Sequence, residues 1–148
     1  MSTQQRSRVS TIVVDSQTAS VLRRQTLIVL EANHHHFEEL LEFGAEAQYA
    51  LSVIYRDAFA VLDALGWPDA DPGTVSVPLT DGHVDQLRRR RHDLGATNID
   101  RLDGIEDAAA IAAIRPQLDA DRTAAQALDR VFSAYLDAIA AARGAPVV

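Results

Sequence analysis

The segment from Glu31 to Glu42 gathers most of the side chains that could bind a metal ion. Glu31, His35, Glu38 and Glu42 recur at spacings of four, three and four, so they share one stripe of a helix. Imidazole and carboxylate groups together suit zinc, iron or manganese. Glu31 and His34 also have the Glu-x-x-His spacing of di-iron carboxylate bundles. Glu31, His34, His35 and Glu38 are therefore the candidate ligands of a transition-metal site.

A solvated helix face explains the same residues without a metal. Di-iron bundles need two Glu-x-x-His pairs and two more glutamates, and the chain has no second pair. Three consecutive histidines also point about 100° apart around a helix, so they cannot all bind one ion. We therefore expect no cofactor, with iron, zinc or manganese as the alternative.

Four consecutive arginines, Arg88, Arg89, Arg90 and Arg91, form the second candidate site. Guanidinium groups bind phosphates and also pair with carboxylates through two parallel hydrogen bonds. Between Arg24 and Arg56 the chain has no cation, but it has five glutamates: Glu31, Glu38, Glu39, Glu42 and Glu46. We predict that the two blocks face each other, within one chain or between two. An anionic ligand and a nucleic acid are the alternatives, and the net charge of −7 disfavours the nucleic acid.

Polar residues on otherwise apolar helix faces form the third candidate site. His34, Gln48, Tyr55, Arg91 and Asn98 fall on the inner faces of the expected helices. Buried polar groups need hydrogen-bond partners, and in coiled coils they set register and oligomeric state. These five residues predict a polar layer or interface, with a small polar pocket as the alternative. His83 stands at a helix start, where we expect it to serve in the capping turn rather than as a base.

The elements that carry these residues are mainly helical. One apolar phase runs from Gln17 to Leu65 and contains Leu27, Leu30, His34, Phe37, Leu41, Gly44, Gln48, Leu51, Tyr55, Ala58, Leu62 and Leu65. A helix of ~49 residues would be about 73 Å long, which is long for one compact domain. A break near Asn33–His36 or near Gly44 would give two antiparallel helices. Because the phase is unbroken, we predict one long helix, with or without a kink.

The rest of the chain predicts two further helices and a small sheet. Segments 9–14 and 74–79 are rich in β-branched residues and could pair as two short strands. A helix starts at Thr80 or Asp81, weakens at Asp103-Gly104 and ends before Pro116, and a last one starts at Asp119 or Asp121. The predicted fold is all-α: an antiparallel helical bundle in one domain, 9–144, after a disordered tail, 1–8.

Composition excludes several classes of function. The chain has no cysteine, so disulfides, thiolate metal sites and cysteine nucleophiles are excluded. No phosphate-binding loop, dinucleotide motif or Gly-x-Ser-x-Gly is present, which favours a non-enzymatic role. No apolar run reaches the ~18 residues of a membrane span, and the polar N-terminus lacks a signal sequence, so we expect a cytoplasmic protein.

These observations predict a helical interaction or oligomerisation protein, either a homodimer or a subunit of a larger assembly. Its partner would be a second copy or another protein. A metal- or cofactor-binding bundle that uses residues 31–42 is the first alternative, and a nucleic-acid-associated regulator that uses Arg88–Arg91 is the second.

Overall fold

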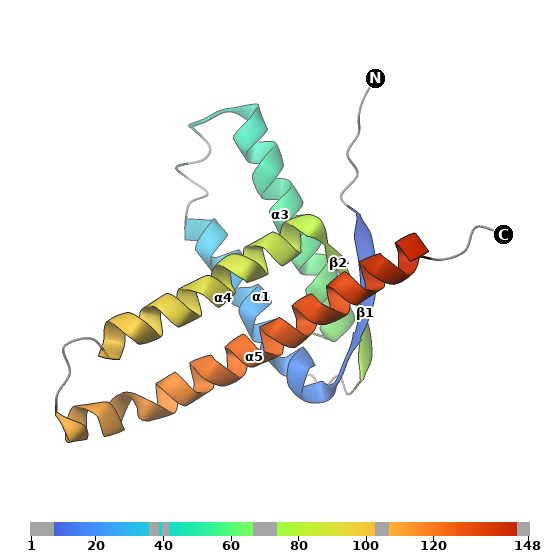
Figure 1. Cartoon of the computed structure of the whole chain (residues 1–148). Coiled ribbons are helices and arrows are strands. Elements are labelled where there is room, and N and C mark those ends of the chain that lie inside the picture. The colour runs from blue at the N-terminus through green and yellow to red at the C-terminus, as the bar shows by residue number, and fades with distance from the viewer. Residues whose placement is uncertain (1–7, 36–38, 40–41, 67–73, 103–106, 145–148) are drawn as a thin grey trace.

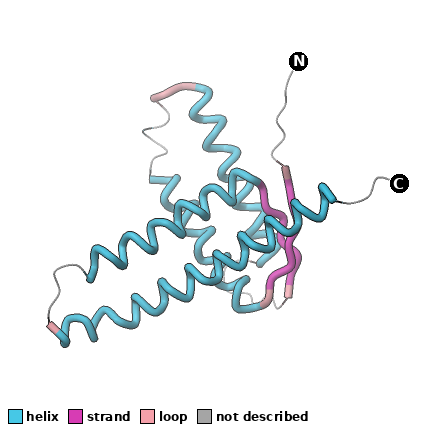
Figure 2. Tube along the Cα trace, viewed as in Figure 1, coloured by secondary structure: helices cyan, strands magenta, loops and turns pink. Residues whose placement is uncertain are grey.

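The chain folds into helices around a small two-stranded sheet (Figures 1 and 2). The computed structural model describes residues 8–35, 39, 42–66, 74–102 and 107–144, and in α4 the side chains only as far as residue 95. The elements are β1 (Val9–Val14), α1 (Ser16–His35), α3 (Ala45–Leu65), β2 (Val75–Thr80), α4 (Asp81–Leu102) and α5 (Ala108–Gly144). The mostly helical fold is confirmed, but the described residues form four helices rather than three long ones.

The predicted pairing of the two short segments is confirmed. β1 and β2 pair antiparallel, with Val9 opposite Thr80 and Val14 opposite Val75. Alternate side chains face opposite sides of a sheet, so Ile12 and Val77 are buried while Val13 is 63% exposed. The sheet therefore has one face in the core and one face in solvent.

The prediction of a continuous helix over 17–65 is wrong. α1 ends at His35 and α3 begins at Ala45, directly after Gly44. Gly44 has φ 91° and ψ −168°, a conformation that is open almost only to glycine. α1 leads away from the sheet, and α3 returns beside it and packs against it (Figure 1). Folding back lets both helices bury their apolar faces in one core, which a single long helix could not do.

The predicted stop at Arg115-Pro116 is also wrong, because α5 continues through Pro116. Proline removes one helical hydrogen bond, but it does not forbid a helix whose other contacts hold it in place. Pro116 is exposed, whereas Ile111, Ile114 and Leu118 around it are partly buried. The weak point predicted at Asp103-Gly104 lies outside the described residues. Of the predicted tail, 1–8, the structure describes only Arg8, which is exposed.

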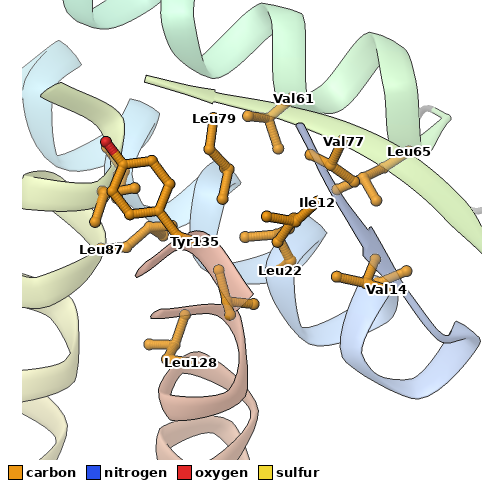
Figure 3. Close-up of a cluster of buried hydrophobic side chains, with 14 of the residues drawn as sticks. Ile12, Val14, Leu22, Val61, Leu65, Val77, Leu79, Leu87, Leu128 and Tyr135 are labelled. Carbon is orange, nitrogen blue, oxygen red and sulfur yellow. The ribbon is translucent and has the colours of Figure 1, made fainter. Parts of the chain in front are cut away.

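The core lies between the sheet and the four helices (Figure 3). β1 contributes Ile12 and Val14, and the side chains that meet them come from every other element: Leu22, Val61, Leu65, Val77, Leu79, Leu87, Leu128 and Tyr135. The Tyr135 hydroxyl donates a hydrogen bond to the Asp81 carboxylate, which ties α5 to the first turn of α4. Among the described residues, none of the helices combines the length and apolar character needed to cross a membrane.

Candidate functional site

An apolar groove of about 500 Å³ lies between α1 and α3. Leu30, Glu31 and His34 line it from α1, and Tyr55 and Phe59 line it from α3. The rings of Tyr55 and Phe59 lie 6.2 Å apart at an interplanar angle of 36°, so they form one aromatic wall. The groove is open to solvent, and Phe59 is 43% exposed.

Further exposed aromatic residues stand near the end of the α1–α3 hairpin. Phe43 is 74% exposed and Tyr49 is 70% exposed. Single exposed apolar residues are ordinary, so Phe43 and Tyr49 do not by themselves indicate a contact surface, whereas the apolar groove does. We call Leu30, His34, Tyr55 and Phe59, together with Phe43 and Tyr49, the hairpin surface.

Among the described side chains, the five residues of the predicted polar layer do not come together in the core. His34 and Gln48 are both exposed, because the turn at Gly44 places them near the end of the hairpin rather than in the core. Tyr55 is partly buried and shares the groove with His34. Arg91 lies instead between α4 and α5, and the side chain of Asn98 lies outside the part of the chain that the structure describes.

The predicted metal ligands come together only in part. Glu31 Oε1 lies 4.0 Å from His35 Nε2 on the same exposed helix face, while His34 lines the groove. Glu38 falls outside the described residues. Within the described ranges, no three histidine, aspartate or glutamate side chains are grouped as a metal site would require.

Among the described residues, Arg88, Arg90 and Arg91 contact residues outside the glutamate-rich segment. Arg88 Nη1 lies 3.7 Å from Asp85 Oδ1, and Arg88 Cζ lies over the Phe132 ring, 5.7 Å from its centre. Arg90 Nε donates to Gln25 Oε1 at 3.2 Å. These arginines therefore join α4 to α1 and α5.

The expected carboxylate partner of Arg91 exists, but it comes from another helix than predicted. Arg91 donates two hydrogen bonds to Asp129 of α5, at 3.1 and 3.3 Å. The pair is partly solvent-exposed, so it orients the two helices and adds little stability.

A buried polar cluster joins α1, α3 and the start of α4, and sequence analysis missed most of it. His83 is 2% exposed, and its Nε2 lies 3.1 Å from the Thr26 hydroxyl. Thr80 donates to Asp57 Oδ2 at 2.7 Å, and its hydroxyl also accepts the backbone N–H of His83 at 3.2 Å. Arg56 pairs with the other oxygen of Asp57 at 3.3 Å. The expected capping turn is therefore present, but His83 is also a core residue.

Burial lowers the pKa of His83 to about 4, and the nearby Asp57 charge opposes this shift only partly. Nδ1 of the imidazole is buried and has no hydrogen-bond partner in the described residues. A charged imidazole would need two acceptors, and this site offers one. The neutral ring therefore suits a structural role. The signal that could have found the cluster was Asp57, a carboxylate on the apolar face of α3 beside Ala58 and Val61.

A second cavity, of about 510 Å³, lies between α1, α4 and α5. Gln25 and Asp121 are buried in its wall, and Arg24, Arg90 and Asp93 add charges of both signs. Gln117 Nε2 donates to Asp121 Oδ1 at 2.7 Å, and Gln25 accepts from Arg90. The first bond lies within α5 and the second joins α4 to α1, so both buried groups have hydrogen-bond partners without a ligand.

Comparison with protein-family models, curated proteins and solved structures finds no match to this chain.

Proposed function

We propose that this chain is a non-enzymatic interaction protein whose hairpin surface binds an amphipathic helix of another protein. The observation that carries the proposal is the open apolar groove with its wall of Tyr55 and Phe59. A groove of this kind between two helices matches the way in which helical peptides dock, with apolar anchors on one helix face. Tyrosine is also enriched among the few residues that dominate the binding energy of protein interfaces.

The charge around the groove defines the partner. Glu31 lines the groove, and Glu39, Glu42 and Glu46 are exposed along the hairpin. No arginine or lysine lies between Arg24 and Arg56. A partner helix with apolar anchors flanked by arginine or lysine would complement this surface, whereas an acidic helix would be repelled.

The test uses a labelled amphipathic peptide built from leucine and arginine, and a second peptide with glutamate in place of arginine. Fluorescence anisotropy should show binding of the basic peptide only. Phe59→Glu should weaken it at least roughly tenfold, because it removes an aromatic anchor from the groove. Leu136→Glu is the matched control, since Leu136 is an exposed leucine of α5 that does not line the groove.

Two results would contradict a helix-binding groove. One is the absence of binding by the basic peptide, and the other is equal binding to the wild-type chain and Phe59→Glu. Light scattering tests whether a second copy covers the groove. A complex of identical chains that Phe59→Glu dissociates would assign the hairpin surface to self-association.

The two alternative functions have weaker support. For a metal-binding bundle, the structure offers the Glu31–His35 pair and a nearby His34. Elemental analysis of protein purified without a histidine tag tests it, and stoichiometric iron, zinc or manganese would favour it. For a nucleic-acid regulator, three of the four arginines have contacts within the protein. A gel shift at low salt with Arg88→Ala and Arg89→Ala tests that role.

A further inference from the structure

The outer edge of β1 is an unpaired strand edge. Within the described residues the sheet has two strands, so each strand has one side with no neighbouring strand among them. Val9 is 59% exposed, Val13 is 63% exposed and Thr11 between them is also exposed. Among the described residues, no backbone–backbone hydrogen bond outside the ladder involves β1. Unpaired edges of this kind are templates for another strand.

Pro78 shows which backbone groups point outward. It stands opposite Thr11 in the ladder and has no N–H to donate. Antiparallel pairs alternate between hydrogen-bonded and non-hydrogen-bonded, so the Thr11–Pro78 pair is of the second kind. The N–H and C=O groups of Val9, Thr11 and Val13 therefore point away from β2, toward the open side.

The two edges of the sheet differ in their capacity to add a strand. On β2 the outward-pointing residues are Ser76, Pro78 and Thr80, so a proline occupies the centre of that edge and removes its donor. Each strand also packs against a helix, β1 against α5 and β2 against α3 (Figure 1), so helix packing does not distinguish the two edges. β1 has donors at all three outward positions. The unbroken row of donors therefore favours β1 over β2 as the edge that accepts a further strand.

The sequence of β1 complements itself. Its solvent-facing side chains read Val9, Thr11, Val13, which is the same in both directions. An antiparallel second copy centred on Thr11 would place Val9 against Val13 at both ends and keep Ile12 on the core side. The three outward residues of each copy would all fall in hydrogen-bonded pairs.

Charge favours the same orientation. Arg8 precedes β1 and Asp15 follows it, and both are exposed. Antiparallel pairing brings Arg8 of each copy toward Asp15 of the other, whereas parallel pairing would place like charges side by side.

We propose that a second copy of this chain pairs with β1 in this register and forms a four-stranded sheet in the order β2, β1, β1, β2. The contact has two-fold symmetry, with Thr11 opposite Thr11 on the axis. It does not use the hairpin surface, so it leaves the groove free for a different partner. The proposal thus names a self-association site in addition to the proposed function.

The absence of cysteine makes the register directly testable. Hydrogen-bonded antiparallel residues have Cα atoms about 5.5 Å apart, within the range that a disulfide spans. Thr11→Cys should therefore form a disulfide with its own copy under mild oxidation, doubling the mass of 16.1 kDa. Val9→Cys and Val13→Cys should each form few crosslinks alone, and many when the two variants are mixed. Ser76→Cys, on the other edge, should remain uncrosslinked.

A second measurement uses the chain without crosslinks. Thr11→Pro removes the central outward donor in both copies and leaves the β1–β2 ladder intact, whereas Thr11→Val keeps that donor. Sedimentation should show a dimer for the wild-type chain and Thr11→Val, and a dissociation constant raised at least roughly tenfold for Thr11→Pro. Circular dichroism checks that each variant is folded.

The proposal is overturned if the wild-type chain is monomeric at high micromolar concentration. It is also overturned if Thr11→Cys crosslinks no better than Ser76→Cys. Phe59→Glu should leave the Thr11→Cys crosslink unchanged, so failure of the helix-binding groove and failure of this contact are distinguishable.

Discussion

Acidification should destabilise the protein through one buried residue, His83. The ring is 2% exposed and packs among α1, α3 and α4, with one nitrogen near Thr26 and the other without a partner in the described residues. Its pKa is lowered from 6.5 to about 4 by burial, against the attraction of Asp57. In the unfolded chain the same imidazole accepts a proton near its ordinary pKa. Protonation therefore favours the unfolded state as the pH falls below 6.5.

The size of the effect follows from the shift. A pKa lower by about 2.5 is equivalent to about 3 kcal/mol of unfolding free energy, which is lost progressively between pH 6.5 and pH 4. About 2 kcal/mol of this should be lost already between pH 7 and pH 5. Aspartate and glutamate side chains of ordinary pKa remain mostly ionised over that window, so their contribution is small.

The assay is urea unfolding followed by circular dichroism at pH 7, 6 and 5. His83→Gln is the matched control, since its amide can still reach the Thr26 hydroxyl and does not titrate. The difference in unfolding free energy between the two proteins should change by about 2 kcal/mol from pH 7 to pH 5, in favour of the variant at the lower pH. An NMR titration of the imidazole protons measures the same pKa directly.

The reasoning is refuted if His83 titrates near 6.5 in the folded protein. It is equally refuted if both proteins lose the same stability between pH 7 and pH 5. Either result would mean that water or another acceptor reaches Nδ1, and that the cluster of Thr26, Asp57 and Thr80 is not closed around the ring.

Three further predictions concern stability and are measured by urea or thermal unfolding. Thr80→Val should lower the unfolding free energy by about 2–3 kcal/mol, because the Asp57 carboxylate loses a donor and the backbone N–H of His83 loses its acceptor. Thr80→Ser keeps the hydroxyl and should lower it by less than about 1 kcal/mol; equal losses would contradict the role of the hydroxyl. Pro116→Ala should stabilise α5 by up to about 3 kcal/mol, and a lower melting temperature would contradict its placement inside a helix. Gly44→Ala should cost about 1–3 kcal/mol because of its positive φ. Gly95 lies inside α4, where an added methyl group would be 3.7 Å from the Arg91 guanidinium, so Gly95→Ala should raise the unfolding free energy by up to about 1 kcal/mol. A change of the same sign in both glycine variants would refute this distinction.

Local patterns in the chain were sufficient for several elements. Alternating β-branched residues at 9–14 and 74–79 predicted both strands and their pairing, because burial on one face of a sheet imposes a period of two. The threonine and aspartate at 80 and 81 predicted the start of α4, because a side-chain oxygen there satisfies a free backbone N–H. The apolar phase predicted the buried face of α3, where Leu51 and Leu62 are buried. It was wrong for α1, whose buried face carries Leu22 and Val29, while Leu27 and Leu30 are only partly buried and His34 is exposed.

The same patterns were insufficient where two outcomes differ little in local energy. The apolar phase continues through Gly44 whether or not the chain turns there, and only the shared core of α1 and α3 favours the turn. At Pro116 the missing hydrogen bond predicted a helix end, but the packing of the residues around it keeps α5 continuous.

By itself the sequence determined the helical character, the paired strands and the capped start of α4. These features depend on neighbours in the chain or on the chemistry of one side chain. Tertiary structure decided which partners meet. It gave Arg91 the aspartate at 129 rather than a glutamate of the hairpin, enclosed His83 beside Thr26, and left His34 and Gln48 exposed. Such contacts join residues far apart in the chain, so they depend on how the helices pack together and cannot be inferred from spacing.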